Sequence, residues 1–450
     1  MSRVFALAVL SLFFGMLIFG CAGQRGSGSL PPIPVPPATI SLPAAPGAPA
    51  AASAANCADY SVESCPSSCV VCPPCAECSS ISCNSAEFCR SIGFESGWYE
   101  GIRQNLAAST GASAGSLYAL HAPQYATLGG KPTLFYEIYL ANRSMDGAKK
   151  LEVLDGNRVL MALDEAELNS SVRVPSGGIN DYAIYMWVPL AEGEKPPLIS
   201  HKLYFEGGKA LEGAKIGINY AAPIVISPPV YGDNWLAAEA PVNTNHHRKG
   251  LFAVTAIAPT PVVGQRYAID WMLYGQNGKL YRTNGMANED WWNYGEEIHA
   301  VADGVIMEAH DGIPSNEVGV EPKPVTLLYV AGNNVVQKIG NGSAYALYAH
   351  MIPGSLRVKI GDKVKKGDVL GLLGNTGNSG APHLHFHLDT SMDVLFGEGV
   401  PYVMDYQYLG NTDWKAQMED DAVWNVPSSA PVPMGSGMPV DGDIVSLARP

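Results

Sequence analysis

The sequence predicts a mainly β protein in which a β-sandwich precedes an antiparallel β-sheet domain. Between residues 115 and 235, short runs rich in branched and aromatic residues alternate with turn signals, a spacing typical of a sandwich. Further strand-like runs separated by glycine turns follow over residues 240–408. There a glycine-rich turn leads into alternating histidines, which an extended strand would place on one face. Helix is expected only in the N-terminal region.

The predicted sandwich is of immunoglobulin-like type and rests on four runs, residues 133–140, 150–154, 182–188 and 199–205. This segment contains no recognisable catalytic constellation. His121 and His201 are isolated in the sequence, and an isolated histidine is more often an ordinary surface or core residue than a ligand.

Residues 1–21 have the features of a secretory signal, with Arg3 followed by an apolar run that ends at Gly20 and Cys21. This ending resembles a lipobox, which predicts export and a lipid anchor at Cys21 on the extracellular or periplasmic face of the membrane. Two alternatives remain open: a cleaved signal without lipid, and an uncleaved membrane-spanning anchor.

Residues 22–56 are rich in Pro, Ala and Gly and nearly free of charge, which predicts a flexible linker. The next segment, 57–110, is a predicted Cys-rich module with a short helix near 85–106. The chain has nine cysteines, and all except Cys21 lie between Cys57 and Cys89. In an exported protein this even number predicts disulfides; a thiolate zinc site is the alternative, because Cys-x-x-Cys spacings recur.

The last segment, 411–450, is rich in Pro, Met and Gly and lacks periodicity, so it is expected to form a loosely ordered tail.

Charge limits the partners of the whole chain. The net charge is −14, from 42 acidic and 28 basic residues. This balance argues against a nucleic-acid partner, which would need a basic face to replace phosphate counterions.

Residues 374–387 read GNTGNSGAPHLHFH and carry the main chemical signal. Imidazole is the commonest protein ligand of zinc, and a catalytic zinc takes three protein ligands and leaves one position open. The alternation of His383, His385 and His387 therefore predicts a catalytic metal site, with further ligands from elsewhere in the domain.

Three motifs occur in a familiar order: Tyr348-Ala349-His350, a Gly-Asp-x-Val turn at 361–364, and the Gly-Asn-Thr-Gly to His-Leu-His-Phe segment. Together they resemble the lysostaphin and LytM type of zinc metalloendopeptidase, the murein endopeptidase family. The resemblance implies a lysostaphin-type antiparallel β-sheet domain over 240–408, similar to a duplicated hybrid motif. It also implies Zn²⁺ bound by His385, water activated by His350 and His383, and a cell-wall peptide or peptidoglycan-like polymer as substrate.

In the resembled family, a His and an Asp four residues apart supply the other two ligands. The counterpart here offers Asp270 but places Arg266 at the position of the histidine. Guanidinium stays protonated and has no lone pair for a metal. We expect Arg266 to turn away and pair with a carboxylate such as Glu289 or Asp290.

A hairpin with strands at 248–257 and 263–270 would set His247 opposite Asp270, since opposed residues lie about 5 Å apart. The predicted metal ligands are therefore His247, Asp270 and His385. His246 would point to the other face of a regular strand, and His387 is expected to support the ligands from behind. In a divergent branch that this segment resembles, a His-Arg pair also precedes a Gln-Arg-aromatic-Ala-Ile-Asp segment, after an Ig-like domain.

The sequence is compatible with three functions. The leading hypothesis is a membrane-tethered zinc metalloendopeptidase that cleaves cell-wall peptide cross-links. The alternative, which Arg266 keeps open, is a metal-free domain that binds wall polymer or activates a partner hydrolase. The turn at 364–370 also looks like a biotinyl or lipoyl carrier; the histidine strand argues against that reading.

Overall fold

The computed structural model describes residues 70–72, 82–84, 115–141, 143–173, 182–249, 262–320, 329–340, 344–392, 397–420, 423–425 and 430–449. The predicted signal, linker and helix at 85–106, and most of the Cys-rich module, lie outside these residues. Within that module, β1 (Val70–Cys72) pairs antiparallel with β2 (Ser82–Asn84). No helix in the described part of the chain is long and apolar enough to cross a membrane.

Two antiparallel sheets form the sandwich that was predicted for residues 115–235. The first contains β3 (Leu117–Tyr118), β4 (Gln124–Leu128), β5 (Lys131–Leu140), β8 (Val172–Arg173) and β9 (Tyr182–Pro189). The second has the order β11-β10-β6-β7, with bounds Ala210–Gly217, Leu198–Phe205, Ala148–Asp155 and Arg158–Leu163. One hydrophobic cluster draws buried residues from both sheets. The four predicted strands are thus found as β5, β6, β9 and β10.

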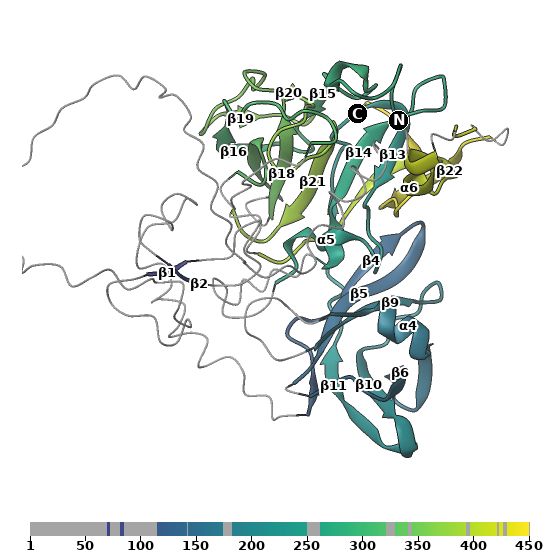
Figure 1. The fold of residues 1–450 in the computed structure, drawn as a ribbon. Coiled ribbons are helices and arrows are strands. Elements are labelled where there is room, and N and C mark those ends of the chain that lie inside the picture. The colour runs from purple at the N-terminus through teal and green to yellow at the C-terminus, as the bar shows by residue number, and fades with distance from the viewer. Residues whose placement is uncertain are drawn as a thin grey trace, which may run out of the picture.

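The second unit is built on one 11-stranded sheet (Figure 1). Its strands follow the order β12-β22-β24-β13-β14-β21-β18-β17-β16-β19, with β23 beside β22. In chain order, their bounds are β12 Ile224–Val225, β13 Gly232–Ala238, β14 Ile269–Leu273, β16 Gly304–His310, β17 Asn333–Ile339, β18 Ala344–Met351, β19 Lys363–Val364, β21 Leu384–Asp389, β22 Tyr402–Asn411, β23 Val432–Gly437 and β24 Asp443–Leu447. A separate pair joins β15 (Glu297–His299) to β20 (Val369–Leu372). The mainly β prediction is confirmed.

Strand β5 packs on both of its faces. Leu134, Tyr136 and Ile138 belong to the sandwich core, whereas Phe135 belongs to the core of the large sheet. Alternate side chains of a strand point to opposite faces, so β5 is buried between the two units. This explains why Leu134 to Leu140 reads as an almost continuous apolar run instead of an alternating one.

The prediction of a loosely ordered tail was wrong for residues 432–447. Strand β24 lies between β22 and β13 in the large sheet, and Ile444, Val445 and Leu447 are buried. The expected domain boundary near 235–240 also needs correction, because β13 ends at Ala238 and pairs with β14. Pairing with distant strands gives these short segments their order, and local composition does not report it.

Helices also occur outside the N-terminal region, so that prediction was wrong. They are α4 (Glu165–Ser170), α5 (His246–Lys249) and α6 (Trp414–Asp420); single 3₁₀ turns occur at Glu206–Gly208, Gly264–Tyr267 (η4) and Asn288–Asp290. Helix α4 begins with a capping box: the side chain of Asp164 accepts from the Glu167 amide at 2.9 Å, and that of Glu167 accepts from the Asp164 amide at 3.0 Å.

Candidate metal centre

Three neighbouring strands bring the predicted site residues together. Asp270 on β14 pairs directly with His385 on β21, and His385 pairs on its other side with Ala349 of β18. His350 follows Ala349, and His383 lies just before β21. Asp270, His350, His383 and His385 are polar and buried.

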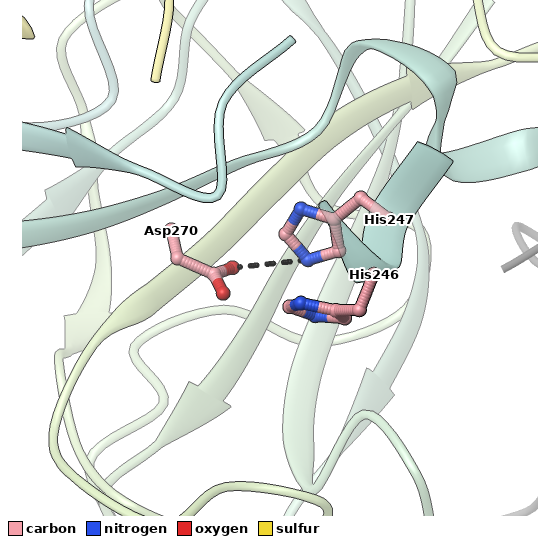
Figure 2. A group of neighbouring side chains, drawn as sticks. All are labelled: His246, His247 and Asp270. Atoms are coloured by element: carbon pink, nitrogen blue, oxygen red, sulfur yellow. Dashed lines mark ion pairs between the residues drawn. The ribbon is translucent and has the colours of Figure 1, made fainter. Parts of the chain in front are cut away.

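His247 reaches Asp270 from helix α5 and not from a hairpin strand. The predicted strand at 248–257 is contradicted at Arg248 and Lys249, which are helical, and the rest of it lies outside the described residues. In the predicted strand at 263–270, residues 264–267 form the turn η4, and Ile269 and Asp270 belong to strand β14. The expected proximity nevertheless holds: Nε2 of His247 lies 3.4 Å from Oδ1 of Asp270 (Figure 2).

The backbone of Glu239 orients the His247 ring. Its carbonyl oxygen can only accept a hydrogen bond, so Nδ1 of His247 donates to it at 2.8 Å. The lone pair of Nε2 is then directed toward Asp270. Glu239 has a φ of +47°, which is uncommon for a residue with a side chain. Strain of this kind is found where surrounding structure fixes a functional group.

His246 lies beside His247, not on the opposite face as predicted. Successive residues of a helical turn are about 100° apart, whereas those of a strand are opposed. The two rings are 4.0 Å apart, and one ligand atom each of His246, His247 and Asp270 lie within 4.8 Å of one another. The Glu239 carboxylate lies 3.1 Å from Nδ1 of His246. Desolvation lowers the pKa of His246, but the bond and charge of Glu239 outweigh it and raise that pKa.

His385 connects Asp270 to a further histidine. Its Nδ1 lies 2.9 Å from Oδ1 of Asp270, and its Nε2 lies 2.9 Å from Nδ1 of His387. Asp270 and His387 thus hold the His385 ring from both sides, which places His387 where a supporting partner was expected.

The histidines His350 and His383 form the remaining side of the site. Nδ1 of His350 donates to the Thr376 carbonyl at 2.7 Å, and Nδ1 of His383 donates to the Ala381 carbonyl at 2.9 Å. Their rings are 4.6 Å apart, and Nε2 of His383 lies 3.7 Å from Oδ2 of Asp270. His350 has a φ of +66°, beside an irregularity in the β17–β18 pairing, and such irregularities redirect side chains.

Burial controls the protonation of three of these rings. Desolvation lowers the pKa of His247, His350 and His385 well below the ordinary value for histidine. These imidazoles are therefore neutral at pH 7. In His247 and His350, Nδ1 donates to a backbone carbonyl and Nε2 carries the lone pair, whereas both ring nitrogens of His385 are hydrogen-bonded.

Arg266 turns away from this cluster, but its partners are not Glu289 or Asp290 as predicted. Its Nη2 lies 2.7 Å from Glu137 on β5, and its Nη1 lies 2.6 Å from Glu398. In a regular strand Arg266 and Asp270 would lie on the same face, because alternate residues share a face. The turn η4 interrupts the strand, so this alternation does not apply. The sequence feature that could have pointed to Glu137 is that it is a single charged residue inside the apolar run of β5, where a buried charge needs a partner.

The donor set suits zinc. One carboxylate faces several neutral imidazoles, a combination of nitrogen and oxygen ligands that zinc accepts in catalytic sites. His246, His247 and Asp270 each offer one ligand atom within 4.8 Å of the others, and Oδ1 of Asp270 is close to the rings of both His247 and His385. His350 and His383 lie beside this group, each with Nδ1 hydrogen-bonded to a backbone carbonyl.

A buried carboxylate beside several imidazoles is a ligand combination that metal-dependent hydrolases use. Residues 291–395 match the model of peptidase family M23, so the chain contains an M23 peptidase domain of the lysostaphin and LytM type. The matched range includes His350, His383 and His385 and begins after His247 and Asp270.

Two curated relatives match the chain. The glycyl-glycine endopeptidase ALE-1 of Staphylococcus capitis is 34% identical over 99 residues, covering 22% of this chain and 23% of that protein. An uncharacterized metalloprotease of Buchnera aphidicola subsp. Baizongia pistaciae is 37% identical over 94 residues, covering 21% and 20%. The chain thus spans less than a quarter of the length of these relatives.

Solved structures that match part of the chain include the catalytic domain of lysostaphin from Staphylococcus simulans, at 21% identity and a TM-score of 0.22, covering 37% of this chain and 88% of that one. Csd3 of Helicobacter pylori is 14% identical with a TM-score of 0.22, covering 70% and 81%.

Proposed function

We propose that this protein is a zinc metalloendopeptidase that cleaves peptide cross-links of the bacterial cell wall. The observation that carries the proposal is the position of Asp270, which has His247 and His385 on either side of one carboxylate oxygen. These three residues would hold the zinc ion. When bound, zinc would supply Lewis-acid activation of water and of the scissile carbonyl.

His383 is the proposed general base. Because its Nδ1 donates to the Ala381 carbonyl, its Nε2 carries the lone pair and faces the Asp270 side of the site. It can take a proton from the attacking water and later deliver it to the leaving amine. His350 is fixed in the same way through Thr376, so its Nε2 can orient that water by accepting a hydrogen bond.

The M23 domain and the ALE-1 match support a peptidase, and the name of that relative, a glycyl-glycine endopeptidase, supports a wall cross-link as substrate. We also propose export and a lipid anchor at Cys21, on the sequence evidence given above. A membrane tether would hold the peptidase close to the wall polymer.

The test is to incubate the full chain with purified peptidoglycan and measure newly released amino groups. Wild type should be active, a zinc chelator should remove the activity, and added zinc should restore it. His383→Ala should bind zinc normally but lose about 10²- to 10⁴-fold in rate. A wild-type protein that binds no zinc and releases no amines would contradict the proposal and favour a wall-binding module.

A further inference from the structure

The segment that carries His247 is anchored on the β-sandwich by its next residue, Arg248. This side chain is fully buried and lies over the Phe135 ring, with its guanidinium carbon 3.7 Å from the ring centroid. Its Nη2 donates to the Tyr136 carbonyl at 2.6 Å, and its Nη1 contacts the Glu137 carboxylate. These partners all belong to β5. Helix α5 has a single turn and cannot fix its own position, so this anchor holds His247 in place together with the Glu239 carbonyl.

Glu137 also holds the segment that leads to Asp270. Arg266 donates to both oxygens of the Glu137 carboxylate, at 2.7 and 3.3 Å, and precedes Asp270 by four residues. One carboxylate of the sandwich therefore binds an arginine from each of two segments that supply proposed metal ligands. Paired, bidentate contacts of this kind fix geometry as well as charge.

The charges of this cluster balance. Arg248 and Arg266 carry two positive charges, and Glu137 and Glu398 carry two negative ones. Burial raises the pKa of Glu137, but the two guanidinium groups outweigh it, and the net pKa is lowered. An arginine left without a carboxylate near the site would oppose a bound cation. Glu137 thus keeps the surroundings of the site electrically neutral.

We propose that Glu137 is a positioning residue of the metal centre, acting through Arg248 on His247, so that the β-sandwich is a working part of the peptidase site. The inference rests on the proposed function for its metal ligands. It assigns the sandwich a role in metal affinity, beyond that of an attached domain. Partners that orient metal ligands typically change metal affinity by 10- to 100-fold.

The test replaces both charges together, as Glu137→Gln with Arg248→Met, in the full chain. Removing one partner alone would leave a buried charge unpaired and could unfold the protein. Leu203→Ala is the matched control, because Leu203 is buried in the sandwich core and lies on β10, whereas Glu137 lies on β5 and Arg248 on α5. The measurements are the zinc Kd by chelator competition, and amide hydrogen exchange of residues 245–249 in the metal-free protein.

The double variant should weaken zinc binding by 10- to 100-fold and lose protection in 245–249, whereas Leu203→Ala should lower only the melting temperature. A folded double variant with wild-type Kd would overturn the inference. If wild type itself binds no zinc, the proposed function fails. Hydrogen exchange then tests by itself whether Arg248 and Glu137 anchor residues 245–249, and unchanged protection in the double variant would overturn that inference.

Discussion

Asp270 and His385 face each other on neighbouring antiparallel strands, with Oδ1 of the carboxylate 2.9 Å from Nδ1 of the ring. Strand pairing sets this contact, so it does not depend on a flexible loop. The same oxygen lies 3.4 Å from Nε2 of His247. The carboxylate is therefore the common point of the proposed ligand set, and the predictions below test what surrounds it.

The first prediction separates the two adjacent histidines of α5. His246→Ala should keep one zinc per chain and lose no more than a few-fold in activity, because Glu239 holds the His246 ring through Nδ1. Its neighbour His247 should be essential, since Nε2 of that ring faces Asp270. Zinc content and amine release, measured for both alanine variants, check this. Loss of zinc in His246→Ala would move His246 into the ligand set.

A second prediction concerns pH. His201 is buried in the sandwich, hydrogen-bonded to the Tyr136 hydroxyl and the Ala214 carbonyl, and burial lowers its pKa to about 4 from 6.5. As pH falls from 6.5 toward 4, His201 becomes protonated in the unfolded chain before it does so in the folded protein. The contribution of the neutral His201 to the unfolding free energy is therefore complete above pH 6.5 and decreases as the pH falls toward 4. The loss approaches about 3 kcal/mol.

Urea unfolding of wild type and His201→Gln at pH 7 and pH 4.5 measures this effect. The variant should show a smaller loss between the two pH values, while His310→Gln, at an exposed position, should behave as wild type. Equal losses in wild type and His201→Gln would show that His201 does not cause the dependence.

Third, the C-terminal strand should be part of the folded core. Leu447→Ala removes a side chain that is 1% exposed in β24 and should cost about 2 to 5 kcal/mol of unfolding free energy. Val432→Ala, at a site that is 50% exposed, should change it by less than about 0.5 kcal/mol. If the two variants were equally stable, β24 would not belong to the core.

The fourth prediction addresses the proposed anchor. In cells, wild type should partition into detergent with a diacylated Cys21 as its first residue, because the run ending at Gly20-Cys21 resembles a lipobox. Cys21→Ser should abolish the lipid mass and release the protein from that fraction. An identical membrane fraction and processed mass for both proteins would rule out lipid at Cys21.

Much of the fold followed from local patterns. The runs that became β5, β6, β9 and β10 carry the period-2 or doubly buried patterns of strands. Strand β24 escaped detection because its order comes from pairing with β13 and β22, far away in the sequence. Long-range pairing leaves little trace in local composition.

The candidate site divides in the same way. Alternation on one strand was enough to group His385 with His387, and motif order was enough to include His350 and Asp270. The helical turn at His246 and His247 could not be anticipated from an expected hairpin, since four residues give no periodic signal. The partners of Arg266 were also hidden, because Glu137 lies 129 residues earlier, in another unit.

We propose above that His247, Asp270 and His385 hold one catalytic zinc ion. The most direct measurement is the zinc content of the purified full chain by mass spectrometry of the metal, for wild type, His247→Ala and His385→Ala, with His310→Ala as the exposed control. We expect about one zinc per chain in wild type and control, and nearly none in the two ligand variants. Full occupancy in His247→Ala, or a wild-type protein that stays zinc-free in the presence of zinc, would contradict it.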